Sequence, residues 1–208
     1  MDSLIGTTGA DTLQGTTASE LILGDPNDTR PGPGNLIRTG GGDDLVFAGY
    51  GADTVLGGAG NDTIYGSGTT SAPGGSAAFY ARDDLVDRLD GGAGDDVISG
   101  GTGDDVLRGG LGADRLQGGA GADLFVFGMT AAPAAFGFDA GAGAARDVVL
   151  DFTQGEDHIR LEAISPSAVT WVERGAGTLV VVAAPDGTRG EIWLSGVQGL
   201  TEADLIFG

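Results

Sequence analysis

The chain has 208 residues, enough for one or two small domains, and its 10 basic and 30 acidic residues give a net charge of −20. This charge argues against nucleic acid and anionic membrane surfaces as partners, and it favours a hard divalent cation. Cysteine is absent, which excludes disulfides, thiolate metal sites and cysteine nucleophiles.

The N-terminal residues have neither the basic segment nor the apolar stretch of a cleavable signal peptide. No window of the chain is apolar enough to predict a membrane span. From Gly6 onward a nine-residue period organises the sequence. Residues 6–14 form a complete copy, residues 15–23 a degenerate copy, and residues 24–38 a copy with about six residues inserted near 25–34.

The most regular copies occupy two later stretches. Residues 39–65 read TGGGDDLVF, AGYGADTVL and GGAGNDTIY, and residues 91–126 read GGAGDDVIS, GGTGDDVLR, GGLGADRLQ and GGAGADLFV. Each has glycine at the second and fourth places, Asp at the sixth and an apolar residue at the eighth. Residues 66–90 fit the same frame with a longer insertion near 68–85.

The eighth place is apolar in all eleven copies. It holds Leu13, Ile22, Ile37, Val46, Val55, Ile64, Leu89, Ile98, Leu107, Leu116 and Phe125. The sixth place is Asp in nine copies, with Glu20 and Asn35 as the exceptions. This pattern predicts a six-residue turn followed by a three-residue strand whose middle side chain points inward.

Two such copies should form one coil of a parallel β-roll. Stacked strands lie about 4.7–4.9 Å apart and calcium–oxygen distances are about 2.3–2.6 Å, so one ion between stacked turns can touch oxygens of both. The spacing therefore predicts several Ca²⁺ ions, each held by sixth-place aspartates and by carbonyls of turn glycines.

The predicted carboxylate pairs are Asp44 with Asp62, Asp53 with Asp87, Asp62 with Asp96, Asp87 with Asp105, Asp96 with Asp114, and Asp105 with Asp123. The predicted glycines are Gly40, Gly42, Gly49, Gly51, Gly58, Gly60, Gly92, Gly94, Gly101, Gly103, Gly110, Gly112, Gly119 and Gly121. Asp11 is a weaker candidate because its turn is poorer in glycine. Without the ion, stacked carboxylates repel by roughly 0.9 kcal/mol per pair even at the dielectric of water. We therefore expect the calcium-free roll to be largely unfolded.

These copies resemble the nonapeptide of the repeat-in-toxin (RTX, hemolysin-type) calcium-binding family. The segment DVVLDFTQGEDHI at 147–159 resembles the cap that follows the roll in serralysin-like proteins, and LTEADLIF at 200–207 resembles their extreme C-terminus. The resemblance implies a roll over 1–126, and a capping and secretion-signal region over 127–208. It also implies export by a type I secretion apparatus through an uncleaved C-terminal signal to a calcium-rich exterior, so the protein would be secreted or associated with the cell surface.

Residues 127–208 show alternating or apolar runs of their own at 148–152, 158–161, 169–172, 179–183 and 191–194, separated by turn signals. They predict a small antiparallel β cap over the open end of the roll, because an exposed last coil would be an aggregating edge. The Ala/Gly-rich stretch 129–145 is predicted to be a loop. The whole chain is thus expected to be all-β.

Catalysis is not expected. His158 is the sole histidine, which excludes a His-Glu-x-x-His zinc site, and no Gly-x-Ser-x-Gly context surrounds a serine. An EF-hand is excluded by the absence of its loop pattern. The doubled acids Asp43, Asp95 and Asp104 at the fifth place are expected to face solvent. Phe79 and Tyr80, in the second insertion, could contact a glycan or a cell-surface partner, or could simply belong to a packed loop.

Two functions follow from these expectations. The first is an exported calcium-binding protein with a surface, matrix or adhesive role. The second is the C-terminal secretion and folding module of a larger secreted enzyme, such as a protease or a polysaccharide epimerase.

Overall fold

The computed structural model describes residues 2–25, 33–67, 86–128, 146–183 and 189–208. Strands and tight turns dominate these residues, with two single-turn 3-10 helices, Pro166–Ala168 (η2) and Glu202–Asp204 (η3). None of the helices in this part of the chain is long and apolar enough to cross a membrane. The inserted segments 26–32 and 68–85, which include Phe79 and Tyr80, and the predicted loop 129–145 lie outside the described residues.

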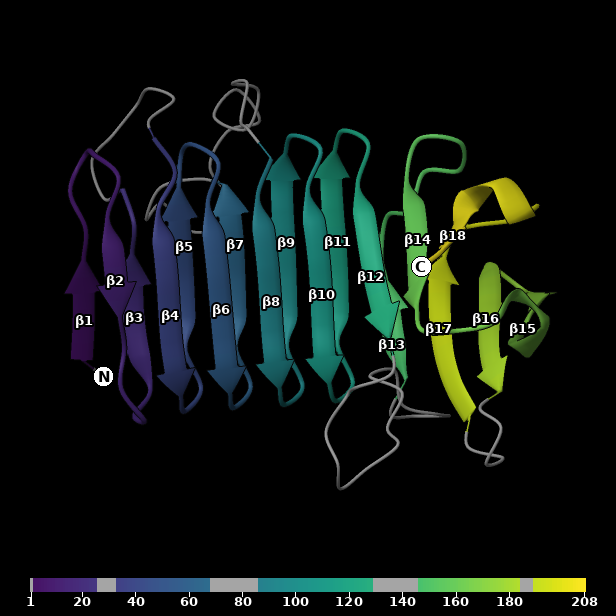
Figure 1. Cartoon of the computed structure of the whole chain (residues 1–208), viewed down its shortest axis with the longest axis horizontal. Coiled ribbons are helices and arrows are strands. Elements are labelled where there is room, and N and C mark those ends of the chain that lie inside the picture. The colour runs from purple at the N-terminus through teal and green to yellow at the C-terminus, as the bar shows by residue number, and fades with distance from the viewer. Residues whose placement is uncertain (1, 26–32, 68–85, 129–145, 184–188) are drawn as a thin grey trace.

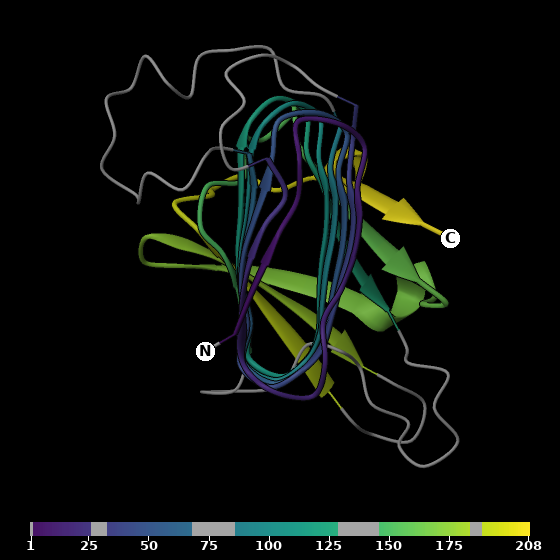
Figure 2. The same cartoon turned by 90° about the vertical axis from the view of Figure 1, so that its left-hand side faces the viewer.

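Strands alternate between two parallel sheets as the nine-residue frame predicts. The strands of the repeat region are β1 (Asp2–Ile5), β2 (Thr12–Gln14), β3 (Glu20–Leu23), β4 (Leu36–Gly41), β5 (Leu45–Gly49), β6 (Thr54–Ala59), β7 (Thr63–Ser67), β8 (Arg88–Ala93), β9 (Val97–Thr102), β10 (Val106–Leu111), β11 (Arg115–Ala120) and β12 (Leu124–Gly128). Odd-numbered strands form one sheet and even-numbered strands the other. The chain therefore winds as a flattened coil, seen side-on in Figure 1 and end-on in Figure 2.

The register shows that both insertions leave the coil frame intact. Ile37 pairs with Leu13 before it and with Val55 after it, so the insertion in the third copy does not shift the strand. Leu89 likewise pairs with Val55 and with Leu107 across the longer insertion. The strands before and after each insertion therefore keep the register of the coil.

Eighth-place side chains fill the narrow space between the two sheets. From Ile22 to Phe125 they are at most 2 % exposed, and Leu13 in the first coil is partly buried. Each coil thus contributes two inward apolar residues, one from each sheet. The core is a double file of side chains whose apolar burial is small per residue.

The C-terminal strands extend both sheets beyond the repeats. They are β13 (Asp147–Val149), β14 (His158–Glu162), β15 (Val169–Arg174), β16 (Gly177–Ala183), β17 (Arg189–Ser195) and β18 (Leu205–Phe207). The predicted antiparallel part is formed by β15, β16 and β17. The sequence did not indicate that β13, β14, β17 and β18 would continue the parallel pairing of the roll.

Candidate metal centres

Glycines at the second and fourth places of each turn have backbone angles that other residues avoid. All fourteen predicted glycines have positive φ, for example 104° at Gly92 and 138° at Gly94. A Cβ on Gly92 would lie 2.2 Å from the carbonyl oxygen of Gly58, and one on Gly94 would lie 1.9 Å from that of Gly60. The carbonyls of one turn thus point at the glycines of the next, and only glycine allows this approach.

Sixth-place residues of stacked turns are joined by a ladder of hydrogen bonds. The backbone N–H of one residue donates to Oδ1 of its counterpart in the next coil. The distances are 2.9 Å for Asp44 to Asp62, 2.8 Å for Asp53 to Asp87, 2.6 Å for Asp62 to Asp96, 2.9 Å for Asp87 to Asp105, 2.9 Å for Asp96 to Asp114, and 3.0 Å for Asp105 to Asp123. All six predicted pairs are therefore brought together, each as one rung of a ladder.

The rungs form two rows, one along each long edge of the roll. Turns that enter odd-numbered strands carry the lower row in Figure 1, and turns that enter even-numbered strands carry the upper row. The lower row holds Glu20, Asp44, Asp62, Asp96, Asp114 and Asp147, and the upper row holds Asp11, Asn35, Asp53, Asp87, Asp105, Asp123 and Asp157.

The second carboxylate oxygen in several rungs is buried without a hydrogen-bond donor. Oδ2 of Asp62, Asp96 and Asp123 has no such partner among the described residues, and each of these side chains is 1 % exposed. Leaving a buried charged oxygen without a donor is costly. These oxygens therefore mark positions where a cation is needed.

A backbone carbonyl shares the space into which Oδ2 of Asp62 and Oδ2 of Asp96 point. A Cβ on Gly91 would lie 2.3 Å from Oδ2 of Asp96 and 2.6 Å from the carbonyl oxygen of Gly109, in the next coil. At Gly57 the corresponding distances are 2.6 Å to Oδ2 of Asp62 and 2.4 Å to the oxygen of Gly91. Two acceptors thus face one small space beside the first-place glycine, here called the cradle. This arrangement suits the all-oxygen coordination of Ca²⁺.

The donor set is mixed rather than purely carboxylate. Within the described ranges no group of three or more His, Cys, Asp or Glu side chains could hold a metal together. Backbone carbonyls would have to complete the coordination of each pair of aspartates. This combination excludes the soft ligand sets of zinc and copper and fits a hard cation with flexible geometry.

Burial raises the pKa of the sixth-place aspartates in the metal-free fold. The pKa of Asp62, Asp96 and Asp123 rises to about 7, first because burial disfavours the charged form and then because carboxylates of adjacent coils repel it. Burial also raises the pKa of Asp44. The charged form of these carboxylates is therefore unfavourable in the fold until a positive charge enters the rows.

Two groups of residues in these turns were missed from the sequence. The first-place glycines that form the cradles, Gly57, Gly66, Gly91, Gly100, Gly109 and Gly118, were not singled out. Asp147 and Asp157 were assigned to the cap, yet they accept the N–H groups of Asp114 and Asp123, each at 2.9 Å. Their Asp-x-apolar spacing, in Asp147 to Val149 and Asp157 to Ile159, is the signal that could have found them.

The terminal turns treat their acidic side chains differently. The backbone N–H of Thr7 donates to Oδ2 of Asp11 at 2.6 Å, and the hydroxyl of Thr7 reaches both carboxylate oxygens. The N–H of Thr153 donates to Oδ2 of Asp157 at 2.7 Å in the same way. Where the second place is threonine, the turn thus satisfies its own carboxylate, so Asp11 does not present the bare oxygen found at Asp96.

Fifth-place acids were expected to face solvent, and they are exposed. They also form a second ladder, because Oδ1 of Asp43 accepts the N–H of Asn61, Oδ1 of Asp95 accepts that of Ala113, and Oδ1 of Asp104 accepts that of Ala122, each at 2.8 Å. These side chains therefore link coils directly and lie outside the cradles.

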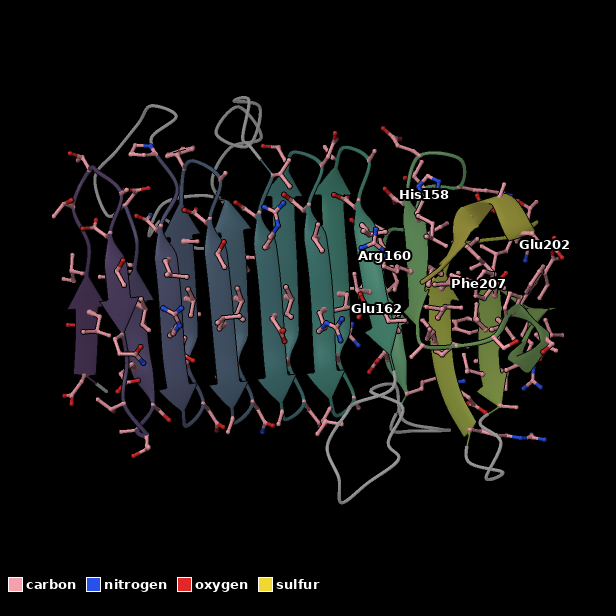
Figure 3. The ribbon with its side chains drawn as sticks, viewed as in Figure 1. His158, Arg160, Glu162, Glu202 and Phe207 are labelled. Atoms are coloured by element: carbon pink, nitrogen blue, oxygen red, sulfur yellow. The ribbon has the colours of Figure 1, made fainter. Side chains whose placement is uncertain are left out.

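His158 lies at the start of β14 and shares that strand with Arg160 and Glu162, as Figure 3 shows. Glu162 forms an ion pair with Arg108 of β10, across the intervening strand β12. His158 is in register with Leu124, at the outward-facing seventh place. Its position is that of a sheet-face residue.

Comparison with known proteins gives one family and several structural likenesses. The family model for the RTX calcium-binding nonapeptide repeat (4 copies) matches residues 1–26, 34–68, 83–116 and 99–128, just over half of the chain. No curated protein matches the chain in sequence.

Among solved structures, the AlgE6R2 subunit of a mannuronan C5-epimerase from Azotobacter vinelandii is 26 % identical, with 59 % of this chain and 88 % of that one covered and a TM-score of 0.43. The AlgE6R3 subunit from the same organism is 21 % identical, with coverages of 96 % and 80 % and a TM-score of 0.32. The extracellular lipase LipA of Serratia marcescens is 15 % identical over all of this chain and 40 % of its own, with a TM-score of 0.35.

Proposed function

Because the chain belongs to the RTX calcium-binding nonapeptide-repeat family, we propose that it is a secreted calcium-stabilised β-roll that holds its ions in the two rows of rungs. The observation that carries this proposal is the pairing, in the cradles of Asp62 and Asp96, of a buried carboxylate oxygen without a hydrogen-bond donor and a backbone carbonyl from the next coil. A cation can contact both oxygens at once and offsets the charge of the buried carboxylate.

The residues proposed to hold the ions are those of the glycine-rich turns. They are Asp44, Asp62, Asp96, Asp114 and Asp147 in the lower row, and Asp53, Asp87, Asp105 and Asp123 in the upper row, with carbonyls of the first-, second- and fourth-place residues between them. A bound Ca²⁺ supplies positive charge and oxygen coordination that offset the burial of these carboxylates. Asp11 is left out because Thr7 already satisfies both of its oxygens.

Binding and folding are proposed to be coupled. The core is a double file of single side chains, so apolar burial is too thin to offset stacked buried charges and the ordering of a glycine-rich chain. Calcium binds the folded coil and not the unfolded chain, and it therefore stabilises the fold by mass action. The chain would remain unfolded at low calcium and fold where calcium is plentiful.

The wider role is proposed from family membership. Export by a type I apparatus, with residues 127–208 serving as cap and secretion signal after a roll in residues 1–126, agrees with a chain that folds only at its destination. A surface, matrix or adhesive role without catalysis is proposed for the folded roll, because its sixth-place acids are engaged in the ladders.

The proposal is tested by replacing one rung residue and its exposed neighbour. Asp96→Asn keeps an acceptor oxygen for the N–H of Asp62 but removes the charge from the cradle, while Asp95→Asn makes the same change in the exposed fifth-place ladder. Equilibrium dialysis with Ca²⁺ should show at least one fewer bound ion for Asp96→Asn and no change for Asp95→Asn. Circular dichroism should show a higher calcium midpoint for Asp96→Asn alone.

A wild-type chain that binds no calcium in dialysis would overturn the proposal. A full β signal in excess chelator at neutral pH would show that folding does not depend on calcium, and it would overturn the proposed coupling of binding to folding.

A further inference from the structure

The turn that carries Asn35 differs from the other turns in the chemistry of its cradle. At Gly91 the two atoms that face each other are both acceptors, Oδ2 of Asp96 and the carbonyl oxygen of Gly109. At Gly24, the equivalent first-place glycine, the two atoms are the carbonyl oxygen of Ala48 and Nδ2 of Asn35, which lie 1.8 Å and 2.8 Å from an added Cβ. A donor therefore stands where the turns of Asp62 and Asp96 have a carboxylate oxygen without a donor.

The side-chain amide of Asn35 is fully engaged. Its Oδ1 accepts the backbone N–H of Asp11 at 2.9 Å, while its Nδ2 donates to the carbonyl oxygen of Ala48 and to Oδ2 of Asp25, both at 3.2 Å. This network settles the orientation of the amide, because the reverse orientation would place a donor against an N–H and an acceptor against two acceptors. Asn35 is 3 % exposed, so these contacts replace water entirely.

Asp25 supplies an anion that other turns lack at this position. It occupies the second place of its turn, where the regular copies have glycine, and its side chain is 3 % exposed. Its Oδ2 also accepts the backbone N–H of Tyr50, in the next coil, at 3.2 Å. The amide of Asn35 thus bridges a carboxylate and a carbonyl of two stacked turns, which is the arrangement of acceptors that a bound cation would bridge elsewhere in the row.

We propose that the Nδ2 group of Asn35 takes the place of Ca²⁺ between the turn that carries Asn35 and the turn that carries Asp53. This inference rests on the proposed function, since it takes the remaining rungs to be calcium sites. In the folded roll, the N-terminal end of the upper row is then joined without an ion, and the row binds one ion fewer than its number of coils suggests. Binding of Ca²⁺ through Oδ1 of Asn35 is disfavoured because that oxygen already accepts the N–H of Asp11.

The matched test converts the donor back into a carboxylate. Asn35→Asp places an acceptor beside the oxygens of Ala48 and Asp25, so this variant should bind one more Ca²⁺ per chain than the wild type in equilibrium dialysis. Asn61→Asp is the control, because Asn61 is an exposed fifth-place residue whose Oδ1 accepts the N–H of Asp95, and a carboxylate can do the same. The control should bind the wild-type number of ions.

Two outcomes would overturn the inference while leaving the proposed function intact. In the first, the wild type and Asn35→Asp bind calcium and fold on it, but in equal number. In the second, which requires no variant, wild-type crystals grown in Ca²⁺ show an ion bonded to Asn35. If the variant fails to fold, the wild-type crystals alone decide, with ions at Asp53 and Asp87 but none at Asn35 as the supporting result. A wild-type chain that binds no calcium would instead overturn the proposed function.

Discussion

At the residue scale, each sixth-place aspartate uses its two oxygens for different tasks. In Asp62 and Asp96, Oδ1 accepts an N–H from the preceding coil while Oδ2 points into the cradle beside the first-place glycine. The first contact sets the rotamer, so the second oxygen is positioned before any ion arrives. Preorganisation of this kind lowers the ordering cost of binding.

The raised pKa values predict that the calcium-free roll is favoured by acid. Asp62, Asp96 and Asp123 have pKa values of about 7 in the fold, against an ordinary value of 3.8. Between these values the folded chain binds protons that the unfolded chain has lost, so the free energy of unfolding falls as pH rises from 3.8 to 7 and is lowest above 7. In chelator, circular dichroism should show more β structure at pH 5 than at pH 8.

With Ca²⁺ present the dependence on pH should reverse, because protons and the ion compete for the same oxygens. The calcium midpoint of folding should therefore rise as pH falls below 7. A calcium-free roll, in excess chelator, that is more stable at pH 8 than at pH 5 would contradict the raised pKa values of these buried carboxylates.

At the element scale, the turn and its three-residue strand form one unit whose shape depends on glycine. Gly40, Gly58, Gly92 and Gly110 stack in one file, and each of the last three has its Cα facing the carbonyl of the glycine before it. Strand pairing sets the distance between the coils. Because glycine has no side chain, the turns can stack at that same distance. Thr39 shows a local variation, since its hydroxyl at the first place donates to the carbonyl of Gly57.

Substitution of a stacked glycine should be far more costly than substitution of an isolated one. Gly92→Ala places a Cβ 2.2 Å from the carbonyl oxygen of Gly58 at a φ of 104°, so backbone strain of about 1–3 kcal/mol adds to a steric clash. Gly175→Ala is the control, with a φ of 58° and no atom within 4 Å of the new Cβ, and it should cost about 1–2 kcal/mol. Unfolding at saturating Ca²⁺ measures both, and equal losses would argue against close stacking of the turns.

At the scale of the whole molecule, the C-terminal strands are continuous with the roll. β13 pairs with β11 on one side and with β17 on the other, and β14 pairs with both β12 and β18. The apolar file continues through Val149 and Ile159 to Leu194 and Leu205, all at most 6 % exposed. The last repeat coil is therefore covered by strands of the same two sheets, which removes an exposed edge.

This continuity predicts that both parts of the chain fold together. Trp193 lies on β17 in register with Val148 of β13, and Arg146 lies over its ring, while Trp171 lies on the outer antiparallel strand β15. In a calcium titration, the fluorescence of a Trp171→Phe variant, which reports Trp193, should change at the same midpoint as the β signal. A Trp193 signal that does not respond to calcium would show that the C-terminal strands fold by themselves.

The nonapeptide spacing by itself determined the coil, its register across both insertions, the inward file of eighth-place residues and the six aspartate pairs. It could do so because strand alternation and coil length are local properties, and every nine-residue copy carries the same pattern for both. The exposure of Asp95 and Asp104 followed from the same alternation, whereas their bonds to the next coil did not.

Only the tertiary structure decided which oxygens need a cation. Asp11 and Asp157 hold the same sixth place as Asp96, but their turns have threonine at the second place, and its N–H satisfies their second oxygen. Asn35 looks like a weakened ligand in the sequence, while in the fold its Nδ2 meets the oxygens of Ala48 and Asp25. The reason is physical: whether a buried oxygen is bare depends on donors brought from other coils, and those neighbours are set by stacking and not by the repeat itself.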